Sequence, residues 1–176
     1  MVRDSIVVRY CRVPTSWGPF LLVTQGERLL ESKLPDETDL DGHLARLHSE
    51  LSAVEDDSIH KPLQESIQRY FEGAPRIRFN ARLVLDGMTD FQKSILRACR
   101  SIGYGKTISY GELAKRAGYP GAARAVGSVM ARNRHPLITP CHRVVASGNR
   151  IGGFSSSSGT ELKRAMLELE GASILA

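Results

Sequence analysis

Short apolar runs separated by turn residues characterise the first third of the chain. Residues 6–13 are dense in β-branched side chains and end at Pro14, and residues 20–24 resume an apolar run after the turn-forming segment 17–19. Residues 76–85 alternate apolar and polar side chains, as a strand with one buried face does. We therefore predict β-strands in all three segments.

Helical spacing of apolar residues occurs twice in the same part of the chain. Four leucines recur every three or four residues within 40–54, which predicts a helix there. A second helix is predicted over 63–72, because Gly73 and Pro75 follow it as stop signals. Strands and helices together predict an α/β fold for this part.

The pattern changes after Asp86-Gly87, and we place the boundary between domains 1–87 and 88–176 there. Beyond it the apolar positions follow helical spacing, and three segments carry capping-box patterns that open helices. These segments are 89–92, 109–112 and 158–161. The second domain is therefore predicted to be mostly α-helical.

Positive charge concentrates in one stretch of the chain. The formal net charge is +5, but residues 88–150 hold 11 basic and only 2 acidic side chains. Such a block is typical of proteins that bind polyanions, although charge alone equally fits a solvated basic surface.

Cysteine usage and the N-terminus indicate an intracellular protein. Cys11, Cys99 and Cys141 form an odd, widely spaced set, which makes a poor disulfide framework, and no CxxC motif or His cluster predicts a metal site. No apolar run is long enough to span a membrane, and residues 1–10 lack a signal-peptide pattern. We expect Cys11 and Cys99 to lie in the core.

Two short helices joined by a tight Gly/Pro turn lie inside the basic block, over residues 109–118 and 122–133. This arrangement is typical of a DNA-binding helix-turn-helix. The second helix is rich in Ala, Gly and Ser, which favours close approach to a phosphate backbone over reading of base edges. Arg124 is the only long side chain on its first turn. The alternative is a plain helical hairpin packed on the core, with Arg124 in solvent.

Cys141 is the candidate nucleophile. Pro140 fixes the backbone before it, and His142 and Arg143 follow. The thiolate is the nucleophilic form, and a nearby imidazole or positive charge lowers the pKa of a cysteine. Neighbouring residues in a strand point to opposite faces, so Cys141 and His142 can cooperate only through a turn or a bridging water. A buried, inert cysteine beside a surface histidine fits this segment equally well.

Glu170 shares the apolar face of the last helix with Leu162 and Met166. A carboxylate on a buried face needs a partner, and His142 is the natural candidate. A Cys–His–Glu relay would result, in which the acid orients and polarises the imidazole. The alternative is that the helix frays at Gly171 and leaves Glu170 in water.

With these residues, the second half of the chain resembles the O6-alkylguanine-DNA alkyltransferase (methylated-DNA–protein-cysteine methyltransferase) family from about Thr89 to Glu170. The most specific part is PCHRV at 140–144, with RAVG at 124–127 upstream. The order of elements in the first half looks like the family's ribonuclease-H-like α/β domain. The resemblance implies a C-terminal helical domain with a winged-helix-like helix-turn-helix.

The resemblance implies DNA repair by transfer of an alkyl group from O6 of guanine, or O4 of thymine, to Cys141, once and irreversibly. His142 would act as a base through a water, Glu170 would polarise His142, and Tyr110 would help the damaged nucleotide rotate outward and the guanine leave. Arg124 would enter the base stack. The implied DNA-binding residues are Ser109, Tyr110, Ala123, Arg124, Ala125 and Gly127. The implied pocket residues are Met130, Asn133, Pro136, Val144, Phe154 and Ser155.

The implied partner is double-stranded DNA containing O6-alkylguanine, bound through the minor groove by a monomer that needs no cofactor or metal. Residence in the cytoplasm of a bacterium or archaeon and in the nucleus of a eukaryote are both compatible with the sequence. Three positions depart from the family pattern: Thr139 replaces an apolar residue, Phe154 stands where many members have tyrosine, and the loop 155–159 is longer and richer in serine. The resemblance implies that the loop forms one wall of the pocket, so the last two departures would bear on the substrate range and on the sensitivity to pseudosubstrate inhibitors.

Two other functions fit parts of the sequence. A DNA-binding module that flags lesions without reacting would bind reversibly and would not depend on Cys141. A cysteine hydrolase would use Cys141, His142 and Glu170 as a triad, but it would leave the basic helix pair unexplained.

Overall fold

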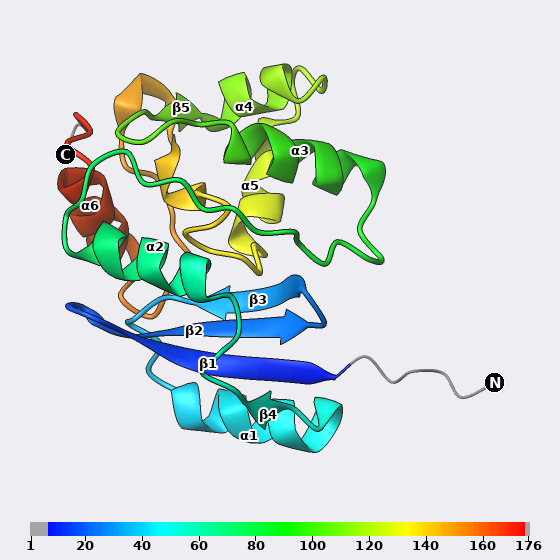
Figure 1. Cartoon of the computed structure of the whole chain (residues 1–176). Coiled ribbons are helices and arrows are strands. Elements are labelled where there is room, and N and C mark those ends of the chain that lie inside the picture. Colours follow the sequence, from blue (N-terminus) through cyan, green and yellow to red (C-terminus); the bar gives the residue numbers. More distant parts are fainter. Residues whose placement is uncertain (1–6, 175–176) are drawn as a thin grey trace.

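The computed structural model describes residues 7–174, which form an N-terminal α/β half and a mostly helical C-terminal half (Figure 1). The elements of the first half are β1 (Val8–Thr15), β2 (Gly18–Gln25), β3 (Arg28–Lys33), α1 (Leu40–Leu51), β4 (Val54–Glu55) and α2 (Lys61–Phe71). The sheet has the order β3-β2-β1-β4, in which β4 is parallel to β1 and the other pairs are antiparallel. The prediction of mixed α/β content is confirmed.

Both faces of this sheet are apolar, and each is covered by a helix. Tyr10 and Val23 point to the face on which Leu44 of α1 packs, whereas Leu22 points to the opposite face and Ile67 of α2. Side chains alternate between the faces of a strand, so strands this apolar need cover on both sides.

Most predicted elements of this half are confirmed with small shifts at their ends, and residue 6 of the first strand lies outside the described range. The strand predicted at 76–85 is wrong, because only Leu83 bridges to β3, at Leu29. Further along β3, the free edge of the strand pairs with the C-terminal half instead: the backbone N–H of Ser32 donates to the carbonyl of Arg134 at 2.9 Å. Strand β3 was not predicted from the sequence, because it has only two adjacent apolar residues.

The C-terminal half is mostly helical, and its two short strands pair in parallel. Its elements are α3 (Asp90–Arg100), β5 (Ile108–Ser109), α4 (Tyr110–Arg116), α5 (Ala123–Ala131), a 3-10 turn at Cys141–Arg143, β6 (Val144–Val145), a 3-10 turn at Ser147–Asn149 and α6 (Gly159–Leu169). None of the helices in the described part of the chain is both long and apolar enough to cross a membrane.

Two of the three predicted capping boxes are confirmed. At Thr89 and Ser109 the side-chain oxygen accepts the backbone N–H of the residue three positions on, at 3.2 Å in both cases. The prediction for Ser158 is wrong, since its side chain makes no capping bond. Its backbone N–H donates instead to Oδ2 of Asp36 at 2.7 Å, so a tertiary contact replaces the local one and ties the start of α6 to the N-terminal half.

The two halves share one apolar core. Ile138 packs with Met166 of α6 against the sheet and α2. His135 belongs to the same junction: the flanking carbonyls of Arg134 and Pro136 both accept hydrogen bonds from Ser32 of β3. The His135 ring is fully buried, and neither ring nitrogen has a hydrogen-bond partner within residues 7–174.

The buried imidazole predicts a pH-dependent stability. Burial lowers the pKa of His135 to about 4 from 6.5, with the charge of Arg134 acting in the same direction. The unfolded chain therefore takes up a proton as the pH falls from 6.5 to about 4 while the folded chain does not, and stability is lost in that window. At pH 7.5 the free energies of unfolding of His135→Leu and wild type differ by some amount, and we expect this difference to shift by about 2 kcal/mol in favour of the variant at pH 5. Urea unfolding measures this difference, and equal pH slopes would contradict it.

Candidate active site

Cys141 begins the 3-10 turn Cys141–Arg143, directly after Pro140. The turn sends consecutive side chains in different directions, so that Cys141 lines a surface pocket while His142 is fully buried. The turn that the sequence requires at Pro140 is therefore present. The surface histidine of the alternative interpretation is wrong, because His142 has no exposed surface.

The pocket at Cys141 has a volume of about 500 Å³ and is lined by both halves of the chain. Five of the six predicted pocket residues line it, namely Met130, Asn133, Pro136, Phe154 and Ser155. Val144 is not among the lining residues; it is fully buried, and its carbonyl accepts a hydrogen bond from Lys163. Glu31 and Asp36 of the N-terminal half also line the pocket, and no sequence pattern indicated them.

Asn133 holds the sulfur in place. Its Nδ2 donates to Sγ of Cys141 at 3.1 Å and to the carbonyl of Thr139 at 2.9 Å, and its Oδ1 accepts the backbone N–H of His135 at 3.0 Å. Burial raises the pKa of the Cys141 thiol, which the hydrogen bond from Asn133 and the charge of Lys163 oppose without reversing. The expected positive charge is present and lowers the pKa, but burial outweighs it, so the pKa of Cys141 is raised overall. The resting thiol is protonated, and its reaction needs a base.

His142 has the properties of such a base. Its Nε2 lies 2.7 Å from Oε1 of Glu170, and because a carboxylate only accepts, Nε2 carries the ring proton. The free lone pair is then on Nδ1, which has no hydrogen-bond partner among residues 7–174. Burial lowers the pKa of His142 even though Glu170 opposes this shift, so the imidazole is neutral at pH 7 and able to accept a proton.

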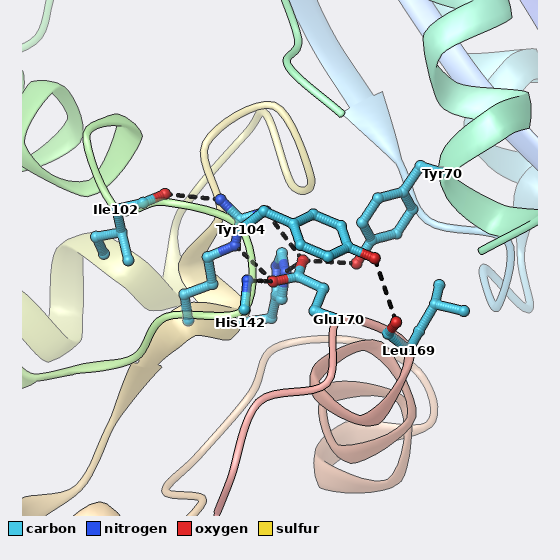
Figure 2. A network of polar contacts seen from close by, with 8 residues as sticks. Tyr70, Ile102, Tyr104, His142, Leu169 and Glu170 are labelled. Carbon is cyan, nitrogen blue, oxygen red and sulfur yellow. Dashed lines mark hydrogen bonds and ion pairs between the residues drawn. The ribbon is translucent and has the colours of Figure 1, made fainter. Parts of the chain in front are cut away.

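Five hydrogen bonds converge on Glu170 (Figure 2). Oε1 accepts from His142, from the hydroxyl of Tyr70 at 2.9 Å and from Nη2 of Arg143 at 3.0 Å. Oε2 accepts from Nε of Arg143 at 2.8 Å and from the backbone N–H of Gly105 at 2.9 Å. Burial raises the pKa of this carboxyl, but His142 and Arg143 outweigh it and lower the pKa to about 2. The predicted contact between Glu170 and His142 is confirmed, and the alternative of a frayed, solvated Glu170 is wrong.

Lys163 is part of the site, although it was not among the site residues predicted from the sequence. The side chain is fully buried, and its Nζ donates to the carbonyls of Val144 at 2.6 Å and Gly153 at 3.1 Å. Burial lowers the pKa of Lys163 to about 8. The residue lies three and seven positions before Met166 and Glu170, so the helical spacing that predicts a buried Glu170 applies to Lys163 as well.

Helices α4 and α5 form the predicted hairpin, with Gly118 and Gly121 in left-handed conformations at the turn (φ 90° and 85°). A shallow hollow along it is lined by five of the predicted DNA-binding residues, namely Ser109, Tyr110, Ala123, Arg124 and Gly127. Ala125 is exposed beside this hollow without lining it. Tyr110 connects the hollow to the site, since Nζ of Lys163 lies 5.9 Å from the centre of its ring.

Known proteins share this sequence pattern. Residues 90–172 match the family model of the 6-O-methylguanine DNA methyltransferase, DNA binding domain. A methylated-DNA–protein-cysteine methyltransferase of Mycobacterium tuberculosis is 34% identical over 164 residues, which cover 93% of each chain. A methylated-DNA–protein-cysteine methyltransferase of Methanosarcina acetivorans is 40% identical over 122 residues, 68% of this chain and 74% of the other.

Solved structures share the fold. The crystal structure of Mycobacterium tuberculosis O6-methylguanine methyltransferase aligns with a TM-score of 0.76 at 34% identity, covering 93% of each chain. The structure of Mycobacterium tuberculosis OGT in complex with DNA also aligns with a TM-score of 0.76 at 34% identity, covering 92% of each chain.

Removal of the Lys163 charge should make Cys141 less reactive. In Lys163→Met the side chain keeps its length but becomes apolar, and the sulfur loses a positive charge that lowers its pKa. We expect alkylation of Cys141 by iodoacetamide at pH 7.5 to slow by about three- to tenfold. The deficit should shrink above about pH 8, where Lys163 itself loses its charge. Peptide mass mapping measures the modification, the nearly fully buried Cys11 and Cys99 are internal controls, and unchanged reactivity would contradict the role of the charge.

Proposed function

Because the chain belongs to the methylated-DNA–protein-cysteine methyltransferase family, we propose that it repairs duplex DNA by transferring an alkyl group from O6 of guanine to Sγ of Cys141. One observation carries the proposal: the sulfur of Cys141 lies on the wall of a pocket large enough for a base. The next residue, His142, is a buried, neutral imidazole whose orientation is fixed by the carboxylate of Glu170. The helix pair α4–α5 lies beside this site, which fits delivery of the base from DNA.

The reaction is a displacement at carbon. The thiol proton passes through a water to Nδ1 of His142, and the sulfur bonds to the alkyl carbon as the bond from that carbon to O6 breaks. The electron pair of the broken bond stays on the guanine, which takes a proton from the hydroxyl of Tyr110. The imidazolium of His142 then returns its proton through water to the tyrosinate, so the step gains and loses no proton overall. Glu170 stabilises the imidazolium that forms. The thioether is not hydrolysed, so each chain reacts once.

The DNA is distorted to reach this site. O6 of guanine is enclosed in stacked duplex, so the damaged nucleotide has to rotate out of the helix to meet the sulfur. We infer that α5 approaches through the minor groove, because its small residues Ala123, Ala125 and Gly127 allow close contact with the backbone. The exposed Arg124 then fills the space left in the base stack. Tyr110, between this surface and the site, helps the nucleotide rotate.

The pocket would hold the base through Met130, Asn133, Pro136, Phe154 and Ser155, with Val144 behind them. We further propose that residues 1–87 form a ribonuclease-H-like domain, which the sheet with its parallel strand β4 supports. Residues 88–176 would form a winged-helix-like domain, which the β5–β6 pair beside the helix pair supports. We propose that the protein acts inside the cell as a monomer.

Alkyl transfer is tested with duplex DNA that carries O6-methylguanine. We expect the protein to gain the mass of one methyl group, which peptide mapping places on Cys141, and the DNA to regain unmodified guanine. The gain should stop at one group per chain because the thioether is stable. Intact-protein mass spectrometry and nucleoside analysis of the DNA measure the two products.

Cys141→Ser is the control, and it should bind the same duplex without any gain in mass. A wild-type protein of unchanged mass in a reversible complex would point to a lesion-binding module instead. Continuous turnover of an ester or amide would point to a cysteine hydrolase.

Arg124→Ala tests how the extrahelical nucleotide is held. The remaining basic residues should still bind DNA, but the repair rate should fall by about tenfold or more because the rotated state loses the side chain that fills the stack. Arg116→Ala, which removes an exposed arginine at the end of α4 in the same helix pair, serves as the matched control. Gel-shift affinity and single-turnover repair rates separate the two effects, and an unchanged repair rate would refute the role of Arg124.

A further inference from the structure

Tyr70 connects the N-terminal half to the carboxylate of the candidate site. It lies near the end of α2, is fully buried and donates its hydroxyl proton to Oε1 of Glu170 at 2.9 Å, across a separation of 100 residues in sequence (Figure 2). Of the five hydrogen bonds to Glu170, this is the one that comes from the N-terminal half.

The hydroxyl of Tyr70 binds the same oxygen atom that orients the imidazole. Oε1 of Glu170 also accepts from Nε2 of His142 at 2.7 Å and from Nη2 of Arg143 at 3.0 Å. Three donors around one carboxylate oxygen fix its position, and each donor draws electron density from it. The hydrogen bond from Tyr70 therefore influences both the direction and the strength of the bond to His142.

The ring of Tyr70 is held so that its hydroxyl cannot turn away. Phe71, Phe79 and Tyr104 surround it, with ring centres 5.1, 5.7 and 6.3 Å away. Burial, together with the negative charge of Glu170, raises the pKa of Tyr70, so the phenol remains a donor at every pH at which the protein would work. The packed rings and the protonated hydroxyl make this contact a permanent part of the site.

We propose that Tyr70 is a positioning residue for the alkyl transfer: its hydroxyl holds Oε1 of Glu170 against Nε2 of His142, so the N-terminal half completes the proton relay. This inference rests on the proposed function of Cys141. It gives the N-terminal half a part in the chemistry in addition to its part in the shared core.

Tyr104 provides a matched comparison. It packs on Tyr70 and lies close to the same carboxylate, but its hydroxyl donates to the backbone carbonyl of Leu169 at 3.2 Å and not to Glu170 (Figure 2). Tyr104→Phe therefore removes one hydroxyl and one hydrogen bond from the same region without removing a donor from the carboxylate. Tyr70→Phe removes the donor and keeps the ring.

The first test is the pH dependence of single-turnover repair of O6-methylguanine duplex by wild type and the two variants. Without Tyr70 the carboxylate binds the Nε2 proton more strongly, which raises the pKa of His142 and moves the acid limb of the profile to higher pH. We expect Tyr70→Phe to lose repair rate relative to wild type as the pH falls, reaching about tenfold at the acid end of the profile, with unchanged DNA affinity. Tyr104→Phe should keep the wild-type profile.

The second test does not use activity. The Nε2 proton of His142 in protein labelled with ¹⁵N at histidine should show a changed NMR chemical shift in Tyr70→Phe and the wild-type shift in Tyr104→Phe. The assignment comes from the loss of this signal in His142→Gln.

The outcomes separate this inference from the proposed function. A methyl adduct on Cys141 with the same pH profile in Tyr70→Phe as in wild type overturns the role of Tyr70 alone. Equal changes in Tyr70→Phe and Tyr104→Phe overturn it as well, because they indicate a purely structural effect. A wild-type protein that acquires no methyl group overturns the alkyl transfer itself and the inference with it.

Discussion

The ionised carboxylate of Glu170 is the constraint on which the rest of the structure depends. A carboxylate removed from water persists only if hydrogen bonds and opposite charges replace its hydration. Glu170 obtains them from three separate places: α2 through Tyr70, the loop at Gly105, and the turn that carries His142 and Arg143. Displacement of any one of them would leave part of the charge without a partner, so the carboxylate holds the two halves and the turn in one arrangement.

The same interior sets the chemistry of the sulfur. Burial keeps Cys141 as a thiol and His142 as a neutral base, so ionisation of the sulfur requires a proton transfer within the site. A thiol that ionises only when His142 accepts its proton reacts more slowly with oxidants and with unrelated alkylating agents than a permanently ionised thiolate would. This property suits a protein whose nucleophile is used once.

Local patterns in the sequence predicted most of the elements and the contact of Glu170 with His142. Lys163 has the same helical spacing, but a lysine in a helix is ordinarily solvated. Only the tertiary structure shows that this one is buried, with two backbone carbonyls as partners of its ammonium group. The alternation in residues 76–85 indicates one buried face, yet it does not say whether a neighbouring strand edge is free. That edge is taken by the C-terminal half at Ser32, so the segment pairs at Leu83 alone.

The sequence by itself determined which residues can do the chemistry and how each lies within its own turn or helix, because spacing and capping act over a few residues. It placed Pro140 before the nucleophile and Glu170 on a buried helix face. Only the tertiary structure decided the protonation states and the distant partners, among them Tyr70. A pKa depends on burial and on charges brought close by packing, and neither quantity can be read from the order of residues along the chain.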